Sequence, residues 1–404
     1  MSAGATTKNL LKGGEFLVKE TDFNDVFTPQ DVSEEQQAIR QAAVDFLDAE
    51  VLKHPHLANE VDLELTKTLL EKIGELGLLG LAIPEEYGGM GQDYNTNSIV
   101  VEAMAKARSF TLSWGAHVGI GSLPIVYFGN EEQKQKYLPK LASGELKACY
   151  CLTEPGSGSD ALGAKTRADL NAEGTHYILN GQKMWITNSG FADVFIVFAQ
   201  IDGDKFTGFI VEKDMPGLSL GAEEKKMGIK GSSTRLVFLE NVKVPKENLL
   251  GEINDGFKYL MTELSQERLV VGLGAIAAAE GVLAATIQYT KDRMAFGKPI
   301  SELQNTRFKL AEMETEVSIG RIFADRCVEL HLDKKLDQAS ASACKYWLTD
   351  LQAKVADECL QLHGGYGYMW EYLAGRAFAD ARVQRIYAGT NEIMKELIAR
   401  KVLK

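Results

Sequence analysis

Residues able to bind a polar ligand gather in a few short segments. The first, from Tyr150 to Asp160, combines the hydroxyls of Thr153 and Ser159 with two glycines, and glycine lets a backbone approach a ligand closely. Hydroxyl and backbone N–H donors of this kind stabilise negative charge as it develops. The second segment, from Asn180 to Asn188, contains Trp185 after an Asn-Gly turn. Either segment alone is weak support for a site, because Gly-Ser-Gly is usually only a turn.

Two further segments lie near the end of the chain. Gln361–Gly367 contains a His-Gly-Gly turn, and Ile386–Glu392 leads through Gly-Thr-Asn into a predicted helix. Helix N-termini attract phosphate oxygens, because their first N–H groups have no partner within the helix.

The hydrophobic pattern divides the chain into three blocks that would position these segments. From about Val32 to Ser143 the period is helical, and Ser33–Gln36 reads as a capping box. From about Cys149 to Leu250, short β-branched runs alternate with turns, which indicates an antiparallel barrel or sandwich. From about Gly256 helices return, and Leu269–Tyr289 is apolar nearly all round, as a helix inside a bundle should be. We predict an N-terminal extension (1–32), a helical domain (33–148), a β domain (149–255) and a helical-bundle domain (256–404).

Composition excludes several classes of function. The formal net charge is −12, from 44 Lys and Arg against 56 Asp and Glu, which argues against broad nucleic-acid or anionic-membrane binding. The 5 cysteines include no CxxC pair, so we expect free thiols and no metal site. We find neither a signal peptide nor the ~18 uncharged apolar residues of a membrane span. A cytoplasmic protein is predicted, and a mature mitochondrial matrix form stays open. The sequence contains no strand-Gly-x-Gly-x-x-Gly-helix unit, which argues against a nicotinamide dehydrogenase.

Taken together and in this order, the four segments closely resemble those of the acyl-CoA dehydrogenase family, from about residue 33 to the last helix. The resemblance implies an α+β multidomain fold with an N-terminal all-α domain, a middle antiparallel β-barrel and a C-terminal four-helix bundle. It implies an oxidoreductase whose cofactor is FAD. It also implies a homotetramer, built as a dimer of dimers, because Arg293, Phe296 and Gln304 resemble residues that each subunit lends to its neighbour's FAD.

The resemblance assigns the FAD contacts residue by residue. Thr153 and nearby N–H groups would meet the pyrimidine edge of the flavin, Trp185 would lie along one face of the ring, and Thr187 would hydrogen-bond N5. Arg293 suits the pyrophosphate, which a guanidinium binds through paired hydrogen bonds. The residues leave an alternative open in each case. The first segment could be only a strand-end turn, Trp185 a core tryptophan, and Arg293 a solvated arginine. The implied set is Tyr150, Leu152, Thr153, Ser159, Trp185, Ile186, Thr187, Arg293, Phe296, Gln304, Gln361, Leu362, Gly364, Gly365, Thr390 and Glu392.

The catalytic base is where this chain departs from many family members. Removing the weakly acidic α-proton of an acyl thioester needs a base, and a carboxylate is the usual one. In many members it is the glutamate of the last motif, a position that Ala388 occupies here. Glu267 lies in a segment that resembles the branched-chain (isovaleryl) and long-chain subfamilies, which implies that it is the base. The alternative is a glutamate in the first turn of a helix, which the macrodipole favours.

The resemblance also implies where the acyl-CoA binds. The N–H of Ala388 would polarise the thioester carbonyl, and Arg268 would position the active-site backbone or CoA. A helix-surface salt bridge is the alternative for Arg268. The implied substrate contacts are Ser159, Ser265, Arg268, Tyr387, Ala388 and Gly389.

The implied reaction is α,β-dehydrogenation of a fatty acyl-CoA to trans-2-enoyl-CoA, as in fatty acid β-oxidation, with electrons passing to electron-transferring flavoprotein. The late segments resemble the long-chain subfamily most, and the early ones the very-long-chain subfamily. Small residues in Gly119–Pro124 would leave room for a long acyl tail, so a medium-to-long straight chain is predicted. The alternatives are a short branched-chain (isovaleryl-type) dehydrogenase, an oxygen-reacting flavoenzyme, and a non-catalytic flavoprotein of the same fold.

Overall fold

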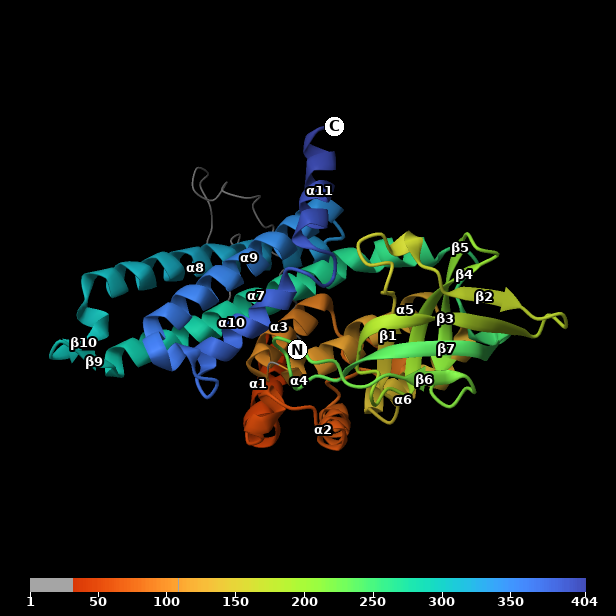
Figure 1. The fold of residues 1–404 in the computed structure, drawn as a ribbon, viewed down its shortest axis with the longest axis horizontal. Coiled ribbons are helices and arrows are strands. Elements are labelled where there is room, and N and C mark those ends of the chain that lie inside the picture. Colours follow the sequence, from red (N-terminus) through yellow and green to blue (C-terminus); the bar gives the residue numbers. More distant parts are fainter. Residues whose placement is uncertain (1–31, 108) are drawn as a thin grey trace, which may run out of the picture.

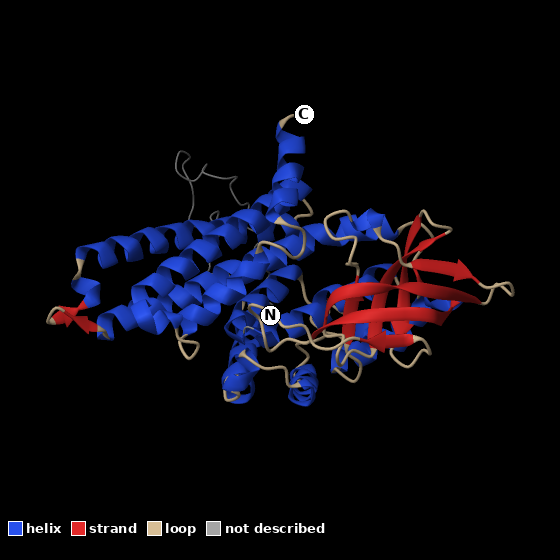
Figure 2. Cartoon of the chain, viewed as in Figure 1, coloured by secondary structure: helices blue, strands red, loops and turns tan. Residues whose placement is uncertain are grey.

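The chain folds into short helices, then a sheet, then a bundle of long helices (Figure 1). The structure is a computed structural model that describes residues 32–107 and 109–404. The extension expected at 1–32 therefore lies, except for Val32, outside the described residues. Figure 2 shows the large sheet at one end of the molecule, and the long helices with a short two-stranded hairpin at the other. The fold class predicted from the sequence is confirmed.

The N-terminal domain is built from short helices around a buried core. Ser33 Oγ accepts a hydrogen bond from the Gln36 N–H, and the Gln36 side-chain oxygen accepts one from the Ser33 N–H, both at 3.1 Å, so the predicted capping box is confirmed. Ile39, Ala43 and Phe46 follow at helical spacing and are buried. The helices are α1 (Glu34–Phe46), α2 (Leu63–Glu75), α3 (Tyr94–Met104), α4 (Ser109–Ala116), α5 (Leu123–Phe128) and α6 (Glu131–Ser143).

The middle domain is an eight-stranded sheet in the order β6-β7-β3-β2-β4-β5-β8, with β1 also paired to β4. Most pairings are antiparallel, as predicted, but β1 and β2 both run parallel to β4. Every residue of β4 is buried. The side chains on one face pack against those of other strands, and the side chains on the other face pack against α5 and α6. The strands are β1 (Ala148–Cys151), β2 (Arg167–Leu170), β3 (His176–Thr187), β4 (Val194–Ile201), β5 (Lys205–Glu212), β6 (Leu218–Leu220), β7 (Thr234–Pro245) and β8 (Leu249–Leu250).

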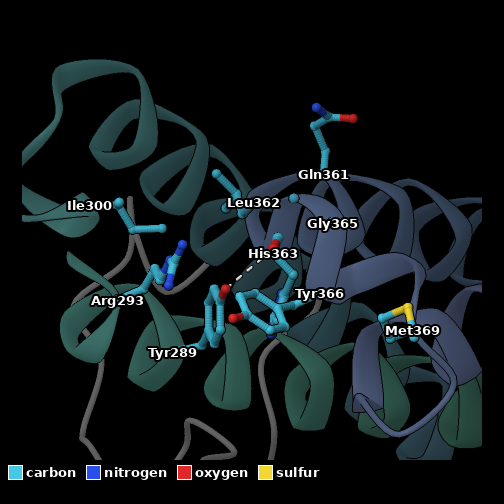
Figure 3. A pocket seen from close by; sticks show the side chains of 10 residues that line it. Tyr289, Arg293, Ile300, Gln361, Leu362, His363, Gly365, Tyr366 and Met369 are labelled. Carbon is cyan, nitrogen blue, oxygen red and sulfur yellow. Dashed lines mark hydrogen bonds between the residues drawn. The ribbon is translucent and has the colours of Figure 1, made fainter. Parts of the chain in front are cut away.

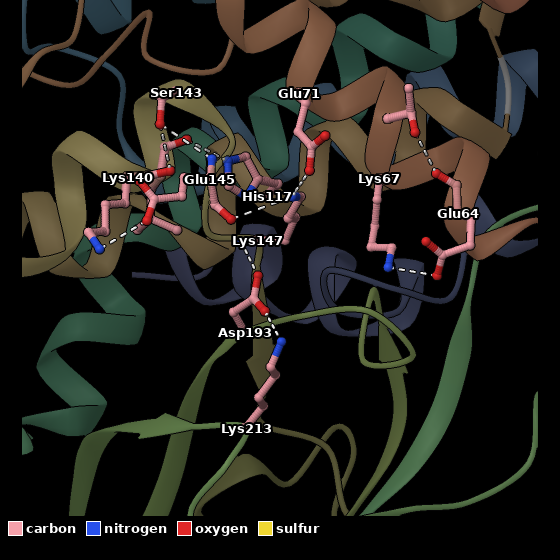
Figure 4. A network of polar contacts seen from close by, with 12 residues as sticks. Glu64, Lys67, Glu71, His117, Lys140, Ser143, Glu145, Lys147, Asp193 and Lys213 are labelled. Atoms are coloured by element: carbon pink, nitrogen blue, oxygen red, sulfur yellow. Dashed lines mark hydrogen bonds and ion pairs between the residues drawn. The ribbon is translucent and has the colours of Figure 1, made fainter.

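A polar network ties the helical domain to the sheet (Figure 4). Asp193, just before β4, accepts a hydrogen bond from the backbone N–H of Lys147 at 2.9 Å and pairs with Lys213 at 2.5 Å. The side chain of Lys147 is buried and reaches Glu71 of α2, also at 2.5 Å. Lys147, the residue before β1, is thus held from both domains, which fixes the direction in which the chain enters that strand.

His117 completes this junction as a neutral buried histidine. Its Nδ1 accepts a hydrogen bond from the Ala148 N–H at 3.1 Å, so the proton is on Nε2, which donates to the Leu141 carbonyl at 3.0 Å. Burial lowers the pKa of His117 to about 4. This histidine therefore has a structural role at neutral pH.

The C-terminal domain is organised around α7, which runs from the sheet to the far end of the bundle (Figure 1). Its buried residues pack in one core with those of α8 and α9, and Gly320 allows close contact, because a Cβ there would lie 2.9 Å from Ile276. A short hairpin of β9 (Met294–Ala295) and β10 (Lys298–Pro299) joins α7 to α8. The helices are α7 (Gly256–Asp292), α8 (Gln304–Leu332), α9 (Gln338–His363), α10 (Leu373–Gln384) and α11 (Asn391–Val402).

By length and composition alone, α7 could cross a membrane. Its buried positions, among them Leu269, Leu273 and Ile276, instead pack against α8 and α9 as the central helix of the bundle. All 5 cysteines are free, as predicted, and all of them are buried. Within the described residues there is no cluster of His, Cys, Asp and Glu that could hold a metal ion.

Candidate active site

Two glutamates one helical turn apart form the chemical centre of the candidate site. Glu263 and Glu267 share a face of α7, because residues four apart in a helix are neighbours. Glu263 is only 4% exposed, and neither oxygen of its carboxyl group has a hydrogen-bond partner among the described residues. Burial, and then the charge of Glu267, raise the pKa of Glu263 to about 9. Burial raises the pKa of Glu267 to about 7, against the opposing effect of Arg268.

This arrangement gives the two carboxyl groups different states at neutral pH. Glu267 is poised to exchange a proton, whereas Glu263 holds one. Glu267 is far inside α7, which begins at Gly256, so it is not the first-turn glutamate that the sequence left as an alternative.

Three tyrosines from other elements surround this turn of α7. Tyr150 of β1 has a buried hydroxyl without a partner among the described residues, and burial and the charges of the two glutamates raise its pKa. Tyr127 of α5 donates to the Gln266 side chain at 2.9 Å, and Tyr94 of α3 donates to the Gln266 carbonyl at 3.3 Å. The N-terminal domain, the sheet and the bundle therefore meet at the candidate base.

The turn between α10 and α11 has an unusual backbone. Ala388 has a φ of 51° and Gly389 one of 87°, and the left-handed region is unfavourable for alanine. Lys345 of α9 donates to the Gly389 carbonyl and to Asn391 Oδ1, both at 2.8 Å. Burial lowers the pKa of Lys345 to about 8, an effect opposed by Asp350.

Arg268 connects α7 to the same helix. Its side chain donates to Ser342 Oγ of α9 at 3.3 Å, and its Nε has no partner among the described residues. The residue is only 3% exposed, so the helix-surface salt bridge left open by the sequence is wrong. Arg268 is a buried positive charge beside the candidate base.

A buried ion pair joins the segment from Tyr150 to Asp160 to the segment from Asn180 to Asn188. Lys183 of β3 is fully buried and contacts Glu154 Oε1 at 2.7 Å and the Leu152 carbonyl at 3.2 Å. The Met184 N–H donates to the Thr153 carbonyl at 2.8 Å. The loop after β1 and the end of β3 are therefore one unit.

A β-bulge decides which side chains of β3 face outward. The register with β7 shifts between Lys183 and Ile186, and Trp185 between them has a φ of 57°. As a result Trp185 is 61% exposed, whereas Ile186 is 3% exposed and packs in the core of the sheet. Trp185 is thus not the core tryptophan of the alternative interpretation, and Ile186 can offer a ligand only its backbone.

A second group of predicted residues lines a cavity of about 500 Å³ at the far end of the bundle (Figure 3). Arg293 lies over the Tyr366 ring, with 5.2 Å between the guanidinium carbon and the ring centroid. Tyr289 stacks on His363 at 4.0 Å and donates to its carbonyl at 3.2 Å. The predicted residues in the lining are Arg293, Gln361, Leu362, Gly364 and Gly365.

The other predicted residues do not line the cavity at the far end of the bundle. Phe296, at the tip of the β9–β10 hairpin, is 91% exposed, and Gln304 is the first residue of α8, but neither lines the cavity. Ser159 is exposed in the loop after β1. Thr390 caps α11 by accepting from the Ile393 N–H. The remaining members are Ser265 in α7, Thr187 at the end of β3, Tyr387 just before Ala388, and Glu392 in the first turn of α11.

The two groups of residues lie far apart within one chain. Glu267 and Arg293 are 293 − 267 = 26 residues apart along α7, or roughly 39 Å at 1.5 Å per residue. The sheet and the Arg293 hairpin are at opposite ends of the molecule in Figure 1. One chain does not bring all the predicted ligand contacts together.

Comparison with known proteins identifies the family. The models of the acyl-CoA dehydrogenase N-terminal, middle and C-terminal domains match residues 33–145, 149–242 and 254–403. The chain belongs to the acyl-CoA dehydrogenase family. It is 47% identical to a Bacillus subtilis protein named a probable acyl-CoA dehydrogenase, over 97% of this chain and 69% of that protein. It is 42% identical to the mitochondrial long-chain specific acyl-CoA dehydrogenase of Sus scrofa, over 92% and 87%.

A similar solved structure identifies the cofactor. The acyl-CoA dehydrogenase of Bacillus anthracis complexed with FAD matches with a TM-score of 0.90 and 45% identity, over 97% of this chain and 72% of that one. FAD is the cofactor of this acyl-CoA dehydrogenase, and the enzyme is an oxidoreductase.

The residues present fit FAD. A Cβ added at Gly364 or Gly365 would meet nothing within 4 Å, so the backbone there is open to a ligand, and Arg293 beside it has no carboxylate partner among the described residues. At the other end, an exposed Trp185 offers a flat aromatic face next to Thr153 and Thr187. These are suitable surfaces for a pyrophosphate and a planar ring respectively.

Three contributors to the site escaped sequence reasoning. Glu263 and Lys345 are buried charged residues within helices, and nothing in their spacing distinguishes them from surface positions. Tyr289 lines the distal cavity from the end of α7. Only the apolar neighbours of Lys345 on α9 could have hinted that its position is inside the bundle.

Proposed function

We propose that this protein dehydrogenates medium-to-long-chain fatty acyl-CoA to trans-2-enoyl-CoA, with Glu267 removing the α-proton. The observation that carries the proposal is the state of Glu267, a carboxyl group with a pKa near 7 where β1 and α7 meet. Ala388 leaves the last motif without a carboxylate, and Glu267 supplies one. A general base works best when its pKa lies near the working pH.

The residues around Glu267 would divide the remaining work. The Ala388 N–H would donate to the thioester carbonyl, which stabilises the negative charge that forms there as the α-proton leaves. Arg268, buried beside the base, would favour its ionised form. FAD, when bound, supplies the acceptor for the β-hydride at N5, so the substrate loses one proton and one hydride.

Two chains would share each FAD. Because Glu267 and Arg293 are roughly 39 Å apart along α7, a five-carbon ribityl chain cannot join a flavin at one to a pyrophosphate at the other. We therefore propose that Arg293, Phe296, Gln304 and the 361–365 segment serve the neighbouring subunit, in a homotetramer built as a dimer of dimers. Sedimentation equilibrium of the FAD-loaded protein tests this, and a mass of one chain would contradict it.

The acyl pocket is proposed to be deep. A Cβ at Gly119 would meet nothing within 4 Å, so this residue leaves open space. Gly121 serves packing instead, because a Cβ there would lie 2.8 Å from that of Ala148 in β1. Space at Gly119 and the likeness to a long-chain specific enzyme both support a medium-to-long chain.

Anaerobic titration of the FAD-loaded enzyme with C8, C12, C16 and isovaleryl-CoA tests the function. Flavin absorbance near 450 nm should bleach with the straight chains, and faster with C12 or C16 than with isovaleryl-CoA. Preference for isovaleryl-CoA would favour the branched-chain alternative. No bleaching with any of the four would rule out the proposal.

The electron acceptor is tested in the same samples. We propose electron-transferring flavoprotein as the partner, and a cytoplasmic location for both. Adding it under anaerobic conditions should restore the 450 nm band, whereas air alone should do so slowly. Rapid recovery in air would identify an oxygen-reacting enzyme instead.

A further inference from the structure

Lys345 is a buried cation that holds the turn next to the candidate base. Its side chain is fully buried within α9, and its Nζ donates to the Gly389 carbonyl and to Asn391 Oδ1, both at 2.8 Å. A buried ammonium group is costly unless it is hydrogen-bonded, so this position is unlike that of an ordinary helix lysine. Gly389 lies in the segment that connects α10 to α11, and Asn391 is the first residue of α11.

The same segment is anchored a second time through Asn391. Asn391 is 2% exposed, and its Nδ2 donates to the Tyr346 carbonyl at 3.2 Å and to Thr349 Oγ1 and Asp350 Oδ1, each at 3.0 Å. The Asn391 side chain is thus bonded to four residues of α9, namely Lys345, Tyr346, Thr349 and Asp350. The turn cannot shift along α9 without breaking several of these bonds.

Such anchoring matters because the backbone it holds is strained. Ala388, immediately before Gly389, has a φ of 51°, and non-glycine residues persist there only when their surroundings fix them. The carbonyl of Gly389 is the atom that Lys345 fixes. The direction of the Ala388 N–H depends on this backbone.

We propose that Lys345 is a positioning residue, which holds the Ala388 N–H toward the acyl thioester carbonyl and adds positive charge beneath the place where negative charge develops. The inference rests on the proposed function, since it assumes that this N–H binds the carbonyl. Arg268 is close enough to affect Lys345 electrostatically, so a second buried cation lies near the first. Preorganised charge of this kind lowers the barrier most when no reorganisation is needed.

The test compares Lys345→Met with Lys354→Met in the FAD-loaded enzyme. Lys354 is on the same helix but is exposed and pairs with Glu316 at 2.6 Å, so its loss should leave the rate of bleaching unchanged. Lys345→Met should lower the rate of bleaching at saturating C12-CoA by about 10- to 100-fold, because a displacement of about 1 Å in a positioned group can cost that much. The dissociation constant for C12-CoA and the FAD content should stay within about 3-fold.

A second measurement distinguishes a positioning role of Lys345 from a general structural role. Exchange of the substrate α-hydrogens with D2O, followed by NMR, reports how well the carbonyl is polarised, and it should slow in parallel with bleaching. If Lys345→Met bleaches flavin and exchanges the α-hydrogens at the wild-type rates, the inference is wrong. A loss of FAD content that accounts for all of the rate loss would equally overturn it, because the role would then be structural.

Thr349→Val decides the matter if Lys345→Met does not fold. It removes the hydrogen bonds between the Thr349 hydroxyl and Asn391 and keeps the shape of the side chain, and we expect a several-fold lower rate with unchanged FAD content. An unchanged rate in Thr349→Val would then overturn the inference. Failure of the proposed function is distinguishable from both results, because in that case the wild-type enzyme would not bleach at all.

Discussion

Glu267→Gln should bind FAD normally and lose about 10²- to 10⁴-fold in the rate of bleaching with C12-CoA, which is the range that general bases contribute. The amide has the shape of the carboxyl group but cannot accept the α-proton. In the wild type the rate should rise with pH through about 7, because only the ionised form of Glu267 is a base. Stopped-flow bleaching from pH 5.5 to 8.5 measures both effects.

The control for this variant is a glutamate that lies outside α7. Glu252→Gln, on an exposed position before α7, should leave both the rate and its pH dependence unchanged. A Glu267→Gln enzyme that keeps the wild-type rate would remove the proposed base. The search for a base would then turn to the neighbouring carboxyl group, Glu263.

Glu263→Gln should make the folded protein more stable at pH 7 by about 3 kcal/mol. The pKa of Glu263 is about 9 in the folded state and near 4.5 when unfolded, so between these pH values the folded state keeps a proton that the unfolded state has released. Stability contributed by this group therefore falls as pH rises from about 4.5 toward 9. At 1.36 kcal/mol per pH unit, the 2.5 units between 4.5 and 7 give about 3 kcal/mol.

Chemical denaturation of the wild type and Glu263→Gln at pH 4.5, 6, 7 and 8 checks this expectation. The stability difference should be near zero at pH 4.5 and should grow steadily with pH. The matched control is Glu132→Gln, at an exposed position of α6, which should change stability by less than about 0.5 kcal/mol at every pH. A difference that does not vary with pH would mean that Glu263 is not held neutral.

Much of the fold was accessible from the sequence, because it depends on local patterns. The change from helical to strand periodicity marks the sheet between the two helical domains, and the capping box at Ser33 gives the start of α1. The parallel pairings of β1 and β2 with β4 were not predicted. They depend on where the loop after β1 returns to the sheet, which no alternation of residues along one strand encodes.

In the site, too, some features were predictable from the sequence and others were not. The motifs alone pointed to FAD and to Glu267, but strict alternation along β3 would place Lys183 and Trp185 on one face. The bulge between Lys183 and Ile186 instead buries Lys183 against Glu154 and exposes Trp185. The charged side chain is inside and the large aromatic one outside, which is the reverse of what their polarity suggests.

The sequence by itself determined the family, the order of the domains and the residue types available for chemistry. Only the tertiary structure decided which carboxyl groups are buried, and therefore that Glu267 has a pKa near 7 and Glu263 one near 9. It also decided that Lys345 lies under the Ala388 turn and that Arg293 is far from Glu267. The physical reason is that burial, and with it charge state, depends on what distant elements pack against a side chain.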